Sequence, residues 1–191
     1  KSEIDVWEKF YSNLTHPVEH LRIGMVGKYF ASGEFVLSDA YISVIEAVKH
    51  ASSYSRIKVE QVWINAEEIE QKGTDVLKGL DGIVIPQGWG SRGVEGKIRA
   101  IQFARENKIP YLGLCFGMQM AVIEYGRHVL GWEDANSEEA NPNTTHPVIH
   151  VMPHQKEYLA NKQYGGTIRL GAWPCVVKPG THLHQAYEIA P

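Results

Sequence analysis

The sequence has few cysteines, no strong excess of one charge and no long apolar run. Only two of its 191 residues are cysteine, Cys115 and Cys175, which is too few for a disulfide framework and makes a reducing, cytoplasmic compartment the expectation. The formal net charge of -3 does not predict binding to nucleic acid or to an anionic membrane surface. No apolar stretch approaches the roughly 18 residues of a membrane span, and the charged opening residues are not typical of a signal peptide.

The composition is that of a folded globular protein. Hydrophobic residues make up 43% of the chain and charged residues 21%, which excludes a disordered tail, a collagen and a coiled coil. The length suits one domain with its own core. Residues 1–20 differ from the rest, because they combine several aromatic and charged side chains. We expect them to form a short helix or linker from an upstream domain, with residues 21–191 as the main domain.

From Leu21 onward, strand and helix signals alternate. Short apolar runs predict strands at 21–26, 57–64, 82–86 and 110–114. Apolar residues at the helical period predict helices after Ser38, from Asn65 to Gly73, at 94–107, and at 116–130 with Gly131 just past the end. This order predicts a parallel sheet with helices on both faces.

The pattern changes after Gly131. Asn, Glu and Pro dominate as far as Pro147. Beyond this point we expect a turn at Pro179-Gly180 and three short strands, at 148–152, 167–170 and 175–178.

The strongest chemical feature is a cysteine between two glycines, where a predicted strand meets a predicted helix. Gly113-Leu114-Cys115-Phe116-Gly117 matches the G-x-nucleophile-x-G turn, which lifts one side chain to the carboxyl end of a sheet. The positive end of the following helix favours the reactive thiolate, and the amide of Phe116 is positioned to donate to an oxyanion. The alternative is a small buried cysteine between packing glycines, but the strand before and the helix after favour a nucleophile.

Cys175 has neither a turn nor a helix beside it. It follows Pro174 in a predicted apolar strand, and we expect a buried structural thiol. A glycine-rich loop over residues 86–90 offers backbone at Gly88 as a second oxyanion donor. The alternative is a turn without a ligand. The loop lacks the Gly-Lys-Ser/Thr of a P-loop and a suitably placed acidic residue for a dinucleotide site.

Four segments resemble one family. Gly90–Lys97 resembles the G-x-R-G-x-E-G-K segment of CTP synthases, and residues 115–119 resemble their C-L-G-M-Q. Residues 134–139 resemble their D/N-A-N-S-T-E, and residues 165–171 resemble their G-G-T-M-R-L-G. The four segments follow one another in the order expected for that family. Almost the whole chain is therefore similar to the glutamine amidotransferase domain of CTP synthases.

The resemblance implies a fold and a reaction. The fold is the three-layer α/β fold of class I glutamine amidotransferases, with a mostly parallel central sheet between helices. The reaction is hydrolysis of L-glutamine to glutamate and ammonia through a cysteinyl thioester, with no cofactor in this domain. In the whole enzyme, a separate ligase domain uses Mg-ATP and the ammonia to convert UTP to CTP, with GTP as allosteric activator. That enzyme is expected to be a cytoplasmic homotetramer.

The resemblance also implies roles for single residues. Cys115 is the nucleophile, and Glu139 pairs with the α-ammonium of glutamine. The other implied glutamine contacts are Gly88, Phe116, Gly117, Met118 and Gln119. Three residues match a lid segment associated with GTP: Arg92, Gly93 and Glu95. The simpler alternatives are a solvated loop charge at Glu139, a helix-face amide at Gln119 and exposed charges at a helix start.

Three departures from the family pattern bear on activity. Gln87 stands where the family has glycine, and a side chain there either obstructs the oxyanion pocket or strains the backbone. Phe116 replaces a leucine. The family's His-Pro-Glu segment, which supplies the general base, and an arginine-rich segment with a further glutamine contact have no counterpart after Cys115. The sequence therefore predicts a domain that lacks its C-terminal part and hydrolyses glutamine poorly by itself.

Five histidines in the second half of the chain are candidate bases or metal ligands: His146, His150, His154, His182 and His184. The first three are four residues apart, which is about 13 Å per step in an extended chain, and Pro147 and Pro153 argue against a helix. The last two have no third ligand at convincing spacing. We therefore predict surface histidines and no metal site.

Two alternatives stay open. A catalytically inactive domain of the same fold, which binds a ligand or a partner, is compatible with the missing base and with Gln87. A cysteine hydrolase of the α/β-hydrolase type uses a similar turn, but it explains neither the Arg92 segment nor the Glu139 segment.

Overall fold

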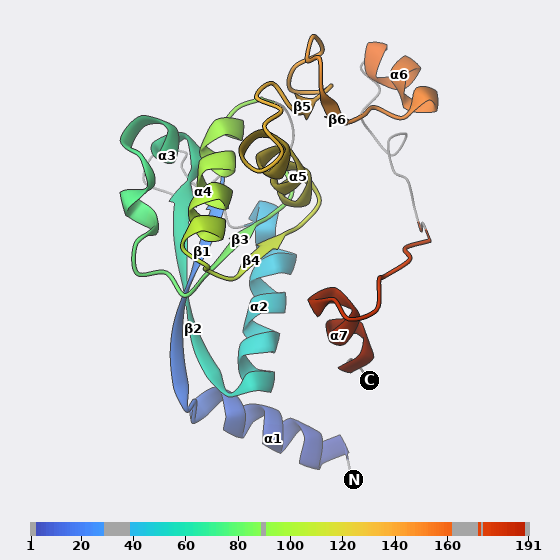
Figure 1. Cartoon of the computed structure of the whole chain (residues 1–191). Helices are drawn as coiled ribbons and strands as arrows, with labels where there is room; N and C mark the ends of the chain where they lie inside the picture. Colours follow the sequence, from blue (N-terminus) through green and yellow to red (C-terminus); the bar gives the residue numbers. More distant parts are fainter. Residues whose placement is uncertain (1–2, 29–38, 89–90, 162–171, 173, 190–191) are drawn as a thin grey trace. The chain divides into compact units, whose positions relative to one another are not determined.

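The computed structural model describes residues 3–28, 39–88, 91–161, 172 and 174–189 (Figure 1). The chain divides into two compact units, Lys1–His150 and Val151–Pro191. Within the described residues, no helix combines the length and the apolar character needed to cross a membrane.

The first unit is built on a parallel sheet. Its four strands are β1 (Glu19–Gly27), β2 (Ile57–Asn65), β3 (Gly82–Ile85) and β4 (Tyr111–Gly113), in the order β2-β1-β3-β4. The register places Met25 between Trp63 and Val84, and Ile85 beside Gly113. A further parallel pair joins β5 (Asn136–Ser137) to β6 (Pro147–Ile149). The predicted parallel sheet is confirmed.

Helices cover both faces of this sheet (Figure 1). The helix α2 (Ile42–Ser55) follows the 3₁₀ turn η1 (Asp39–Tyr41) and packs on one face. On the other face lie α3 (Ala66–Lys72), which the 3₁₀ turn η2 (Thr74–Leu77) follows, α4 (Val94–Glu106) and α5 (Phe116–His128). The first helix, α1 (Glu3–Thr15), packs against α2, where the Ser53 hydroxyl donates to the Phe10 carbonyl at 3.0 Å.

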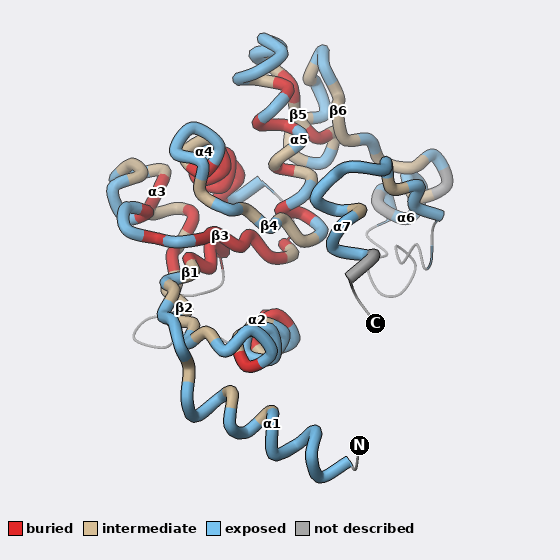
Figure 2. Tube along the Cα trace, turned by 60° about the horizontal axis from the view of Figure 1, so that its bottom comes forward, coloured by how far each residue is buried: buried red, intermediate tan, exposed pale blue. Residues whose placement is uncertain are grey.

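The alternation of side chains along the strands divides the core in two. Ile83 and Ile85 pack under α4 and α5, whereas Val84 between them packs with Met25 against Tyr41 and its neighbours on α2. Figure 2 shows buried residues along β1 and β3 and on one side of α4. The result is the expected three-layer arrangement with helices on both faces.

Most helix ends follow the local sequence signals. The Asn65 side chain accepts a hydrogen bond from the Glu67 amide at 3.0 Å, and Gly73 with φ +85° ends α3, as predicted. In contrast, α5 ends at His128 with Val129 as its C-cap, two residues earlier than predicted. Gly131, with a positive φ of +74°, therefore lies in the loop after the cap. The predicted cap at Ser38 lies outside the described residues.

The second unit corrects two expectations about strands and cysteine. Residues 175–178, predicted as a strand, belong to no regular element, and Cys175 is exposed rather than buried. An apolar run becomes a strand only where a partner strand is available to it, and none pairs with this run among the described residues. The predicted strand at 167–170 lies outside the described residues. The turn at Pro179-Gly180 is confirmed, with Gly180 at φ +76°.

The second unit also contains two helices that the sequence analysis missed, α6 (Pro153–Ala160) and α7 (His182–Ile189). Pro153 occupies the first position of α6, where a missing amide costs no internal hydrogen bond. The expectation that no helix joins His146, His150 and His154 is confirmed, because residues 146–152 are not helical. The Thr181 hydroxyl accepts from the His184 amide at 3.2 Å and so caps α7.

Candidate active site

Cys115 occupies a sharp turn between β4 and α5. Its backbone lies at φ 54° and ψ −107°, a sparsely populated conformation for a side chain with a Cβ, which costs about 1–3 kcal/mol. Three backbone hydrogen bonds hold the turn: Leu114 N to Ile85 O at 2.9 Å, Gly117 N to Leu114 O at 3.0 Å and Gln119 N to Cys115 O at 3.2 Å. The thiol is exposed. The predicted strand, turn and helix around this cysteine are confirmed.

The two glycines of the turn are required by close backbone contacts. A Cβ on Gly117 would lie 2.0 Å from the Ile85 carbonyl oxygen, and one on Gly113 would lie 2.7 Å from the Gly117 carbonyl carbon. The Tyr111 hydroxyl donates to the Gly117 carbonyl at 2.7 Å. Burial raises the pKa of Tyr111, so this hydroxyl stays a donor over the working pH range. Contacts with β3 and β4 therefore hold the first turn of α5 in place.

The second glycine loop follows β3, which is the neighbour of β4 in the sheet. Gly88 is buried, and a Cβ there would lie 3.6 Å from Cδ1 of Phe116. Gly88 and Phe116, whose backbones are the expected oxyanion donors, are thus adjacent. The Gln87 side chain donates to the Ala40 carbonyl at 3.0 Å, and Gln87 is not among the non-glycine residues with positive φ. The backbone strain that the sequence suggested for Gln87 is therefore not found.

Two lysines flank the buried Phe116 ring. The Lys97 Nζ lies 4.7 Å from the ring centroid and the Lys28 Nζ 5.9 Å from it. Burial, and then the charge of Lys28, lower the pKa of Lys97 to about 8. Burial and the charge of Arg92 lower the pKa of Lys28, while Glu139 and Glu67 act against this.

Lys97 belongs to none of the roles inferred from the sequence, although the sequence carries a signal for it. It lies three residues after Val94 and four before Ile101, two apolar residues of the buried stripe of α4. A lysine on such a stripe predicts a buried ammonium.

Glu139 lies in a loop that hydrogen bonds hold in shape. Its amide donates to the Ser137 hydroxyl at 3.2 Å, and its exposed carboxylate is close enough to Lys28 to raise the pKa of that lysine. Asp134 anchors the same loop, because its carboxylate accepts from the Thr145 amide at 2.7 Å and also bonds the Thr145 hydroxyl and the His146 ring. These bonds, those from Thr145 first, lower the pKa of Asp134.

The three residues matched to a GTP lid start α4. Gly93 is the N-cap at φ +72°. The Arg92 guanidinium donates to the Lys28 carbonyl at 3.3 Å and lies 3.4 Å from the Glu67 carboxylate, while most of it stays exposed. Glu95 accepts two hydrogen bonds from Arg127 of α5, at 3.0 and 2.9 Å. Arg92 and Glu95 therefore both have structural contacts within this unit.

The remaining glutamine contacts implied by the sequence lie at the start of α5. Gly117 is buried, Gln119 is half-buried and Met118 is exposed. All follow Cys115 directly, so the turn brings them to the same end of the helix.

The candidate histidines fall in both units of the chain. His146 bonds Asp134, and the His150 ring lies 3.6 Å from the Glu138 carboxylate, whereas His182 and His184 belong to α7 in the second unit. The side chain of His154 lies outside the described residues. Within the described residues, no group of three His, Cys, Asp or Glu side chains could hold a metal ion.

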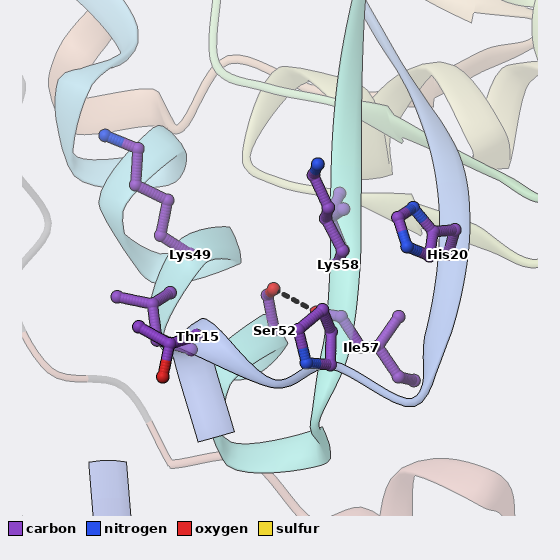
Figure 3. Close-up of a pocket in the computed structure, with 9 residues that line it drawn as sticks. Thr15, His20, Lys49, Ser52, Ile57 and Lys58 are labelled. Carbon is purple, nitrogen blue, oxygen red and sulfur yellow. Dashed lines mark hydrogen bonds between the residues drawn. The ribbon is translucent and has the colours of Figure 1, made fainter. Parts of the chain in front are cut away.

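A cavity of about 400 Å³ lies away from Cys115. It is bounded by α1, α2 and the first residues of β1 and β2, including His20, Lys49 and Lys58 (Figure 3). Inside it, the Ser52 hydroxyl donates to the Ile57 carbonyl (Figure 3). Cys115 follows the carboxyl end of its strand, whereas this cavity is at the amino ends, so the cavity and the cysteine turn are at opposite edges of the parallel sheet.

Comparisons with known proteins point to one family. A family model described as glutamine amidotransferase class-I matches residues 36–168. A CTP synthase of Caldanaerobacter subterraneus subsp. tengcongensis is 50% identical over 189 residues, which is 98% of this chain and 34% of that protein. A CTP synthase of Moorella thermoacetica is 47% identical over 186 residues, 97% of this chain and 33% of that protein. The chain thus spans about a third of the length of these curated relatives.

A solved structure is similar as well. It is the glutaminase domain of CTP synthase from Trypanosoma brucei with bound acivicin. It is 43% identical and superposes with a TM-score of 0.63, covering 70% of this chain and 50% of that chain.

Proposed function

Because the chain belongs to the class-I glutamine amidotransferase family, we propose that it is the glutaminase part of a CTP synthase and hydrolyses L-glutamine with Cys115 as the nucleophile. The observation that carries this proposal is the strained turn at Cys115, with an exposed thiol at the start of α5. The similar full-length proteins are CTP synthases. In the proposed whole enzyme, a separate ligase domain uses ATP and the released ammonia to convert UTP to CTP.

The first chemical step is attack by the thiolate. The amino terminus of α5 carries the positive end of the helix dipole, which stabilises the thiolate. The sulfur attacks the side-chain carboxamide carbon of glutamine, and the carbonyl oxygen becomes an oxyanion. The amide of Phe116 and backbone at Gly88 are the proposed donors to this oxygen, and the packing of Gly88 against Phe116 supports this assignment.

The next steps require proton transfer. The carbon–nitrogen bond breaks as the leaving nitrogen takes a proton from an acid–base group, which gives ammonia and a thioester. Water then gives a proton to that group and attacks the thioester, so that the carbon–sulfur bond breaks, glutamate leaves and the thiolate is restored. A positioned acid–base group accelerates such steps by about 10²–10⁴-fold. Because His146 bonds Asp134 and the His150 ring lies beside Glu138, we propose that this chain by itself forms the covalent bond but turns over slowly.

Substrate selection is proposed to depend on charge. Glu139 is the partner for the α-ammonium of glutamine, and the exposed carboxylate in a well-anchored loop supports this role. Met118 and Gln119 add contacts at the start of α5.

Arg92, Gly93 and Glu95 stay a proposed GTP lid for the whole enzyme, and the exposed guanidinium of Arg92 supports an anionic ligand. The homotetramer and the cytoplasmic location likewise stay proposals for the longer protein.

Acivicin, a chloro-isoxazoline that mimics glutamine, tests the proposed function. We expect incubation of the chain with acivicin to add one label at Cys115 with loss of chloride, and excess L-glutamine to slow this labelling. Intact-mass measurement and peptide mapping report the site. D-glutamine is the matched control, because it carries the same groups with the wrong geometry. Equal labelling with and without L-glutamine would contradict a glutamine site and favour a non-catalytic binding domain.

Replacing Glu139 tests the binding of the substrate ammonium. Glu139→Gln removes the negative charge, and we expect glutamine binding to weaken by about 1.5–3 kcal/mol, the range for a hydrogen bond to a charged group. Calorimetry on the Cys115→Ser background measures this affinity without turnover. Glu138→Gln is the control, because the neighbouring carboxylate lies toward His150 instead. If both variants bind glutamine as the parent does, Glu139 is not the ammonium partner.

A further inference from the structure

Lys97 is a buried ammonium that the described contacts leave unpaired. Its side chain is fully buried in α4, and its Nζ has no hydrogen-bond partner. Among the described charged groups, the electrostatic neighbour that acts on it is another cation, Lys28. An ammonium without a counter-charge in a protein interior is costly, because desolvation is not offset by an ion pair. The fold by itself therefore gains little from this charge.

The position of this ammonium is defined by two contacts. Its Nζ lies 4.7 Å from the centroid of the Phe116 ring, and it would be 3.1 Å from a Cβ on Gly88. Gly88 and Phe116 are the two residues whose backbone is proposed to bind the oxyanion, and Phe116 directly follows Cys115. The ammonium is therefore buried directly beside the two residues of the proposed oxyanion pocket.

A cation in this place has an electrostatic effect on the reaction. The thiolate and the oxyanion both carry negative charge, and a positive charge in a low-dielectric surrounding acts over longer distances than one in water. The attraction of the ammonium to the face of the Phe116 ring also restrains that residue. Both effects favour the charged species at Cys115.

We propose that Lys97 is a positioning residue of the glutaminase site, whose buried ammonium stabilises the Cys115 thiolate and the oxyanion from beside Phe116 and Gly88. This inference rests on the proposed function for its catalytic part, whereas its effect on the thiol is independent of glutamine.

Other charged groups lie around the site, and the test must separate the effect of Lys97 from theirs. Lys28 lies on the same ring, Arg92 and Glu67 lie near Lys28, and Glu139 approaches Lys28 from the loop after α5. With a pKa of about 8, Lys97 is mostly protonated at neutral pH and loses its charge above that value. Its stabilising effect on the thiolate is thus present at neutral pH and is lost in alkaline solution.

Lys97→Met is the central variant, because methionine keeps the length of the side chain without the charge. We expect alkylation of Cys115 at neutral pH to slow about tenfold, because the variant removes a charge that favours the thiolate. The rate of iodoacetamide reaction at Cys115, followed by peptide mapping over a series of pH values, gives this change and any change in the pKa of the thiol. We expect the melting temperature to stay the same or to rise, since the variant removes an unpaired buried charge.

Lys72→Met is the matched control, because Lys72 is exposed on α3 and pairs with Glu68 at 2.8 Å. It should change neither the thiol pKa nor the labelling by acivicin. A Lys97→Met protein with a native melting temperature and an unchanged thiol pKa would overturn the proposal. So would a lower melting temperature with an unchanged thiol pKa, which indicates a structural role. Should methionine prevent folding, Lys97→Gln is measured in the same way with the same criteria.

The acivicin reaction separates this inference from the proposed function. If acivicin labels the parent chain and Lys97→Met equally fast and the thiol pKa is also unchanged, the inference about Lys97 fails and the glutaminase proposal stands. If acivicin does not label the parent chain but Lys97→Met still raises the thiol pKa, the glutaminase proposal fails and the electrostatic link between Lys97 and Cys115 stands.

Discussion

Replacing Cys115 by serine is expected to abolish covalent labelling by acivicin and to lower any glutaminase rate by about 10⁴-fold or more, as the loss of a nucleophile does in other enzymes. Serine places a hydroxyl in the same turn, so the start of α5 no longer has a thiolate to stabilise. It keeps the shape of the turn, so the fold should be unchanged. Intact mass after incubation with acivicin, and ammonia release from glutamine, measure the two effects.

Cys175→Ser is the matched control for this experiment. Because Cys175 is exposed, a general alkylating reagent should label both cysteines of the parent chain. Acivicin should label only Cys115, since recognition of glutamine requires the surrounding pocket. Acivicin labelling that is lost in Cys175→Ser and kept in Cys115→Ser would show that the wrong thiol has been assigned.

Gly117→Ala is expected to destabilise the fold by about 3–5 kcal/mol, which is among the largest effects of single substitutions. The new Cβ would lie 2.0 Å from the Ile85 carbonyl oxygen. The Cβ is bonded directly to the backbone, and the oxygen is part of the backbone. Neither can move away without shifting the start of α5 from β3. Labelling of Cys115 by acivicin should be lost as well, because the turn and the first helical amides move together. Urea unfolding measures the stability.

Gly126→Ala provides the comparison within the same helix. Its Cβ would lie 3.0 Å from the Ala135 Cβ, a tight contact that a small loop movement relieves. Alanine also gains about 1 kcal/mol of helix propensity over glycine. The net change should stay within about 1 kcal/mol. Equal unfolding midpoints for the two alanine variants would contradict the close contact at Gly117.

The nucleophile turn was predictable because its determinants are local. Gly113 and Gly117 flank Cys115 within five residues, and an apolar strand and a helical period stand on either side. The same locality explains the correct prediction of α3, where Asn65 caps the first turn and Gly73 ends it. In each case the backbone conformation depends on neighbours in the sequence.

Predictions failed where the outcome depends on distant partners. Residues 175–178 have the composition of a strand, but a strand needs another strand beside it, and Cys175 became exposed for the same reason. The effect of Gln87 also depended on a distant group, because its side chain reaches the Ala40 carbonyl in η1.

The sequence by itself determined the alternation of strands and helices from β1 to α5, the position of the cysteine between two glycines and the resemblance to one family. Only the tertiary structure decided what surrounds that cysteine. It brought Gly88, in the loop after β3, against Phe116 of α5, and buried the ammonium of Lys97 from α4 beside both. Such contacts join residues far apart in the chain, and they exist because parallel strands carry their carboxyl ends to one edge of the sheet.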